Sequence, residues 1–174
     1  MNRLALHLGA AVLVLGLTAL ALQPAQASAA PDRGLRRCQA AIHDRAVRYA
    51  IYTAPHWTVR CVRKIRQPGF SGAVGLTITV QREILIVTST GDPRSILAHE
   101  LAHAFSWDRM SVEERATFAR RVGEPAFYGG SIWATMPAEI WANNQARCAG
   151  YRNLAPTSRV PCKLIRRFVR QARG

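Results

Sequence analysis

Acidic residues and lysine are both scarce in this chain of 174 residues. It has 10 Asp and Glu against 24 Lys and Arg, its only lysines are Lys64 and Lys163, and its formal net charge is +14. Such a surplus of arginine reflects either a GC-rich genome or attraction to anionic material such as cell wall or lipid headgroups. The arginines are spread along the whole chain, with no compact basic block interleaved with aromatic residues. The sequence therefore predicts no specific nucleic-acid partner and keeps anionic cell-surface material as a candidate partner.

Long apolar runs are absent except at the N-terminus. There, an almost wholly apolar stretch of residues 4–22 follows Arg3 and precedes a run of small residues at 25–30. This order is typical of a secretory signal peptide cleaved near residues 27–29, although an uncleaved membrane anchor is the alternative. We expect residues 1–29 to be removed, which lowers the net charge by one, to +13. Residues 30–174 should then form one secreted domain with no stable membrane insertion.

No C-x-x-C spacing occurs, which argues against a zinc site built from cysteines. The four cysteines are Cys38, Cys61, Cys148 and Cys162. In an exported chain they predict two disulfides, for which three pairings are possible. We favour Cys38–Cys61 and Cys148–Cys162, because each closes a short local loop.

Apolar periodicity predicts a helix, then strands, then several helices. The expected helices cover residues 35–52, 94–105, a segment starting at 111, 137–147 and 163–171, and the expected strands cover 57–63, 76–80 and 84–87. Asp92 and Pro93 are suited to cap and open the second helix. This order favours an α+β fold in which a small twisted sheet packs on the helix of residues 94–105, with further helices toward the C-terminus.

That helix contains His99-Glu100-Leu101-Ala102-His103. Histidines four residues apart lie on one helix face, one turn apart, where both imidazoles can bind one metal ion. The segment resembles the H-E-x-x-H helix of the zincin metallopeptidases. The resemblance implies a zincin-like fold, Zn2+ as cofactor, His99 and His103 as ligands, and Glu100 as the general base toward a zinc-activated water.

A catalytic zinc usually takes a third protein ligand. No histidine follows His103, so the longer metzincin motif is absent, and the remaining candidates are downstream acids or the upstream histidines. Glu139 is the acid that best fits, because it lies in an apolar helical segment. Its distance from His103 resembles that in the gluzincins, which implies Glu139 as the metal ligand. Those enzymes carry a further acid four residues later, where this chain has Asn143, whose amide carbonyl could orient a ligand histidine.

Four aromatic residues near these segments are candidates for roles in the site or in the core. Tyr128 and Tyr151 are candidates for oxyanion stabilisation, although packing is the more ordinary role of each. We expect Trp133 and Trp141 in the core. The strand at 76–80 is a candidate sheet edge for pairing with an extended peptide.

The sequence as a whole favours a secreted zinc-dependent metallopeptidase acting on a protein or peptide substrate. Two alternatives stay open. One is a basic, disulfide-stabilised cell-surface binding protein with a non-catalytic H-E-x-x-H segment, and the other is a zinc-dependent cell-wall amidase.

Overall fold

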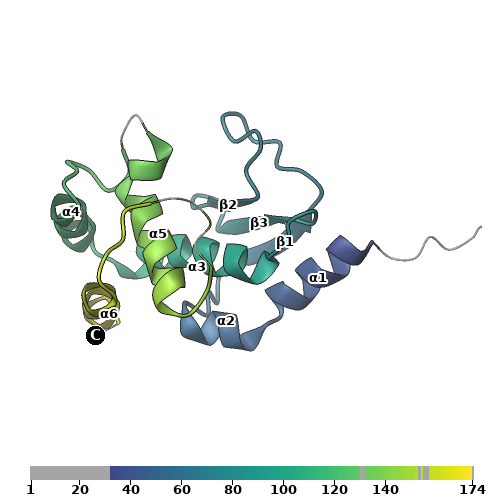
Figure 1. Ribbon diagram of the computed structural model, residues 1–174, viewed down its shortest axis with the longest axis horizontal. Coiled ribbons are helices and arrows are strands. Elements are labelled where there is room, and N and C mark those ends of the chain that lie inside the picture. The colour runs from purple at the N-terminus through teal and green to yellow at the C-terminus, as the bar shows by residue number, and fades with distance from the viewer. Residues whose placement is uncertain (1–31, 130–131, 153, 155–156, 174) are drawn as a thin grey trace, which may run out of the picture. The chain divides into compact units, whose positions relative to one another are not determined.

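The computed structural model describes residues 32–129, 132–152, 154 and 157–173, so the expected signal peptide lies outside the described residues. Within them the fold is mixed α+β, with six α-helices, one 3-10 turn and one three-stranded open sheet (Figure 1). The elements are α1 (Arg33–Ile42), α2 (Arg45–Ala50), β1 (Thr58–Val62), β2 (Gly75–Ile78), β3 (Glu83–Val87), α3 (Pro93–Arg109), α4 (Val112–Arg121), η1 (Trp133–Thr135), α5 (Pro137–Cys148) and α6 (Cys162–Gln171). None of the described helices is both long and apolar enough to cross a bilayer.

Helix α3 lies at the centre of the domain. Its start is confirmed, because the Asp92 side chain accepts a hydrogen bond from the Ser95 amide and Pro93 occupies the first turn. The helix is buried on nearly every side from Ser95 to Leu101, and Leu97, Leu101 and Phe105 are fully buried. The sheet and α5 both pack against α3 (Figure 1). A helix that packs against neighbours on several faces carries apolar residues on more than one face. The apolar residues of α3 therefore do not form a single stripe.

The three strands are ordered β1-β3-β2. β3 pairs in parallel with β1 and antiparallel with β2, with Leu76 opposite Leu85. β2 and β3 form a hairpin, in which β2 ends at Ile78 rather than at the expected residue 80. Arg82 in its turn adopts the left-handed region, with φ of 50°. β3, which is apolar and buried from Ile84 to Val87, lies in the middle, and β2 forms one edge of the sheet.

Two expectations about helices need correction. The single helix expected at 35–52 is two helices, because Asp44 caps a new helix with a hydrogen bond from the Ala46 amide. α3 extends to Arg109 rather than ending at residue 105. By contrast, the helix beginning at Ser111 is confirmed, with a capping box in which Ser111 and Glu114 bond reciprocally. The capping signals at Asp92 and Ser111 therefore predicted two helix starts correctly, whereas apolar periodicity missed both the break before α2 and the end of α3.

Both expected disulfides are present. Cys38–Cys61 joins α1 to β1, and Cys148–Cys162 joins the end of α5 to the start of α6. The described residues contain no free cysteine. Two structural disulfides indicate an oxidising, extracellular environment.

Asp108, near the end of α3, accepts three contacts from distant parts of the chain. Its Oδ2 accepts hydrogen bonds from the Trp57 indole at 2.6 Å and the Tyr52 hydroxyl at 3.0 Å. Its Oδ1 lies 3.2 Å from Arg82 Nη1, and the Asp108 side chain is only 8% exposed. Asp108 therefore fastens α3 to the segment before β1 and to the hairpin.

We expect Asp108→Ala to lower the free energy of unfolding by about 3 kcal/mol, because two partly buried donors lose their acceptor. Asp108→Asn keeps a carbonyl acceptor and should cost less. Urea unfolding of both variants measures this. An Asp108→Ala protein as stable as the wild type would show that the network contributes nothing.

Candidate metal centre

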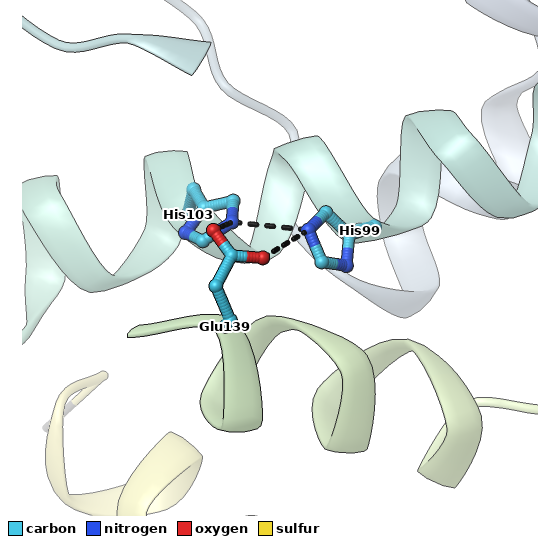
Figure 2. Close-up of side chains that lie close together, drawn as sticks. All are labelled: His99, His103 and Glu139. Carbon is cyan, nitrogen blue, oxygen red and sulfur yellow. Dashed lines mark hydrogen bonds and ion pairs between the residues drawn. The ribbon is translucent and has the colours of Figure 1, made fainter. Parts of the chain in front are cut away.

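Three side chains from two helices converge at one point. His99 and His103 project from the same face of α3, and the Glu139 carboxylate reaches them from the first turn of α5 (Figure 2). The His99 Nε2 and His103 Nε2 atoms are 3.1 Å apart. Glu139 Oε2 lies 3.1 Å from His99 Nε2, and Oε1 lies 3.3 Å from His103 Nε2. The structure thus brings together the three residues that the sequence suggested as metal ligands, and this group could hold a metal ion.

The spacing of these atoms matches what a tetrahedral ion requires. Bonds of about 2.0–2.1 Å in tetrahedral geometry place neighbouring ligand atoms about 3.3–3.4 Å apart. The two histidine nitrogens are 3.1 Å apart, and each lies 3.1–3.3 Å from a different oxygen of the Glu139 carboxylate. Glu139 Oε2 is buried and receives no hydrogen bond from the described residues, despite its nearness to His99. Two imidazoles and one carboxylate are also a common ligand set of catalytic zinc, which leaves a fourth position open.

The electrostatics of the group favour positive charge at this point. Burial alone would raise the pKa of Glu139, but the charge of His103 and contacts with both histidines lower that pKa to about 2. Burial alone would lower the pKa of His103, but the negative charges of Glu139 and Glu100 raise it. Without a metal ion, the neighbouring carboxylates therefore favour a proton on His103. A bound cation would neutralise the same negative charges.

Glu139 is positioned by the way α5 starts and packs. Pro137 opens the helix, and the Ala138 amide bonds to the Phe127 carbonyl. One turn further on, the fully buried Trp141 donates from its indole to the Ala102 carbonyl of α3 at 3.1 Å. This contact joins the two helices that carry the ligands. The expectation that Trp141 belongs to the core is confirmed.

Glu100 lies beside the cluster and is fixed by the edge strand. Its Oε2 accepts a hydrogen bond from the Thr77 hydroxyl at 2.7 Å, and its side chain is buried. A Cβ atom on Gly75 would lie 2.4 Å from Glu100 Oε1 and 2.6 Å from the Ile96 side chain. Only glycine therefore lets β2 approach this closely. Thr77 and Gly75 were missed at the sequence level, since nothing in the alternating pattern of that strand distinguishes them.

The cluster opens into a cavity of about 830 Å³. His99, Glu100 and His103 line it together with Glu139, the loop of residues 69–74 and β2. Several aromatic and apolar side chains complete its wall, namely Trp107, Tyr128, Trp133, Met136 and Leu154. Apart from the ligand group and Glu100, no charged side chain lines it in the described part of the chain. The expectation that Trp133 is a core residue is wrong, because it is 50% exposed on this wall, where the 3-10 turn η1 presents it.

The two tyrosines suggested for oxyanion stabilisation lie in different places. Tyr128 is in the cavity wall, with its hydroxyl 3.4 Å from Ser106 Oγ, and partial burial raises its pKa. Tyr151 packs against the core and does not line the cavity. Tyr128 is therefore the one of the two that a ligand in this cavity could reach.

Asn143 is buried near the cluster, but its carbonyl has another partner. Asn143 Oδ1 accepts a hydrogen bond from the Leu154 amide at 3.3 Å. Its Nδ2 and the Nδ1 atom of His99 are both buried without a partner among the described residues. The expected support of a ligand histidine by Asn143 thus stays a prediction. The competing ligand candidates lie outside the cluster: Asp108 is held in its own network, and His43 and His56 are exposed.

Comparison with protein-family models, with curated proteins and with solved structures gives no match to this chain. The site is thus characterised by its own geometry, as a buried histidine-histidine-glutamate group able to hold a metal ion at the base of a cavity.

Proposed function

We propose that the protein is a secreted zinc-dependent peptidase of the zincin type, with a gluzincin-like ligand set of His99, His103 and Glu139. The observation that carries the proposal is the convergence of these three ligand atoms within 4.8 Å, next to Glu100, in one cavity. The H-E-x-x-H sequence, the donor set and the oxidising environment indicated by two disulfides support it.

Zinc at this site would supply Lewis acidity that lowers the pKa of a water. Glu100 follows His99 directly and lines the same cavity. These two features support our assignment of its carboxylate as the base that would accept the proton of that water. The water oxygen would add to the peptide carbonyl carbon, and Glu100 would donate the proton to the amine nitrogen as the C–N bond breaks. The Thr77 hydroxyl, bonded to Glu100 Oε2, holds this carboxylate on the cavity side of α3. The Tyr128 hydroxyl is the candidate donor to developing negative charge on the substrate.

An extended peptide is the substrate that the cavity suits best. β2 forms one edge of the sheet, and Leu76 and Thr77 line the cavity beside Glu100. A sheet edge binds an extended chain through backbone hydrogen bonds. Such a chain along β2 would pass in front of Glu100, and apolar side chains could contact Trp107 and Trp133.

Thr77→Val should lower the rate of peptide hydrolysis about 10–100-fold, because it removes one hydrogen bond to a charged group worth about 1.5–3 kcal/mol. Zinc affinity should not change, since Thr77 contacts no ligand of the proposed site. Thr77→Ser keeps the hydroxyl and serves as the matched control. Steady-state kinetics with a zinc titration measure both effects. Equal rates for the wild type and Thr77→Val would show that the hydroxyl does not position Glu100.

To test the proposed function, the zinc-loaded mature protein is incubated with an unfolded protein such as reduced casein and, separately, with purified cell-wall peptidoglycan. Hydrolysis of each substrate is measured. Peptide products that disappear with a chelator and return with zinc support the proposal. Release from peptidoglycan alone would favour the amidase. Tight zinc binding without hydrolysis of either substrate would favour a binding protein.

A further inference from the structure

A second concave surface lies away from the metal centre and has a different character. It is a cavity of about 570 Å³ formed by the end of α4, the segment 158–161 and α6, and it shares no lining residue with the metal-centre cavity. Five cationic side chains surround it: Arg121, Arg159, Lys163, Arg167 and Arg170. We call it the basic groove.

None of these five cations is neutralised by the described residues. Within the described part of the chain, no carboxylate lines the groove and none of the five cations forms an ion pair. All five are exposed. Lys163, Arg167 and Arg170 are spaced by four and three residues on α6, so they lie along one face of that helix. Like charges gathered without counter-charges repel one another, and an anionic ligand would relieve this repulsion.

The groove also has an apolar floor, formed by Val122, Val160 and Leu164. Among the described residues that line it, none is an aromatic side chain on which a nucleic-acid base could stack. Backbone groups in segment 158–160 already have hydrogen-bond partners. The Val160 amide donates to Asn144 Oδ1, the Ser158 carbonyl accepts from Asn144, and the Val160 carbonyl accepts from Arg147. An extended peptide would find few backbone groups to pair with. A ligand must therefore be recognised by side-chain charge and apolar contact together.

From this combination we propose that the basic groove binds an anionic phospholipid, with the phosphate against the arginines and part of an acyl chain on the apolar floor. Guanidinium groups match phosphate oxygens in a bidentate geometry, and four of the five cations are arginine. α6 itself stays in the domain, because Ile165 and Phe168 are buried in the core and Cys162 is tied to α5. The domain would therefore lie on an anionic membrane surface without inserting a helix into it. This proposal is independent of the chemistry at the metal centre.

The test is co-sedimentation of the mature protein with vesicles of phosphatidylcholine containing about one fifth phosphatidylglycerol, compared with pure phosphatidylcholine. One variant replaces three cations of α6: Lys163→Gln, Arg167→Gln and Arg170→Gln. It should bind anionic vesicles about 100-fold more weakly. Each cation near such a surface contributes about 1 kcal/mol, and about 1.4 kcal/mol corresponds to a tenfold change in affinity. The control Arg33→Gln, Arg36→Gln and Arg37→Gln removes the same charge from exposed positions of α1, a helix distant from α6 (Figure 1). It should weaken binding only a few-fold.

A second arm tests the apolar floor. Val122→Thr changes polarity with little change in shape, and it should weaken binding to short-chain phosphatidylglycerol but leave binding of inorganic phosphate unchanged. Thermal unfolding of each variant confirms that it is folded. The proposal is overturned if both triple variants weaken binding equally, which would indicate net charge alone. It is also overturned if polyglutamate binds the groove and vesicles do not, which would indicate an acidic protein partner.

Discussion

Glu139→Ala is expected to abolish useful zinc binding and, with it, hydrolysis. Glu139 provides the single anionic ligand of the group, and its loss would leave two neutral imidazoles whose nitrogens face each other at 3.1 Å. Loss of a residue that only supports a ligand lowers metal affinity about 10–100-fold. The zinc affinity of Glu139→Ala should fall by more than that. A competition titration against a chromophoric zinc chelator measures this directly.

Glu113→Ala is the matched control for that experiment. Glu113 is an exposed acid in the first turn of α4, outside the cluster, so its removal changes the net charge equally without touching the site. Asp108→Ala is unsuitable, because the Asp108 carboxylate holds Tyr52, Trp57 and Arg82. If Glu139→Ala bound zinc as tightly as the Glu113→Ala control, the third ligand would be another group and the gluzincin-like assignment would be wrong.

The second large effect is expected from Glu100→Gln, which should retain zinc but lose hydrolysis by about 10²–10⁴-fold. Glutamine has the shape of glutamate and keeps an oxygen that can accept the hydrogen bond of the Thr77 hydroxyl. Glutamine cannot accept a proton from water at neutral pH. The variant therefore removes the base and leaves the fold unchanged. Single-turnover hydrolysis of a quenched fluorescent peptide, with the zinc content measured on the same sample, tests this.

Two results would change the role given to Glu100. Loss of zinc from Glu100→Gln would mean that the Glu100 carboxylate is needed for the metal rather than for proton transfer. Hydrolysis at the wild-type rate with full zinc occupancy would mean that another group accepts the proton. Either result would leave the histidine-histidine-glutamate group in place and remove only the proposed mechanism.

Much of the candidate metal centre was predictable because its residues depend on local rules. The i, i+4 spacing places His99 and His103 on one face of a helix whatever surrounds it. Asp92 and Pro93 located the start of that helix, and loop length selected the two disulfides among three pairings. Glu139 was found because few acids follow His103 in a chain that is poor in acidic residues.

The remaining features depend on contacts between distant segments, which a single sequence does not encode locally. The bond of Thr77 to Glu100 and the need for glycine at Gly75 arise only when β2 lies against α3. Trp133 was misplaced in the core because an aromatic residue can equally line a cavity. The break in the helix expected at 35–52 was missed because apolar spacing continues past Asp44, whose side chain caps the second helix by accepting a hydrogen bond from the Ala46 amide.

The basic groove illustrates the same limit. Its cations come from α4, the segment before α6 and α6 itself, and along the sequence they look like part of an even spread of arginine. The disulfide between Cys148 and Cys162, the packing of α6 and the hydrogen bonds of α5 to segment 158–160 bring them around one apolar floor.

The most direct test of the central claim is the metal content of the purified mature protein, residues 30–174, measured by mass spectrometry after dialysis and after re-titration with zinc. We predict saturation at one zinc per chain, removal by a chelator, and loss of binding in His103→Ala. Absence of saturable zinc binding in the folded wild-type protein would contradict the metal centre and the proposed peptidase together.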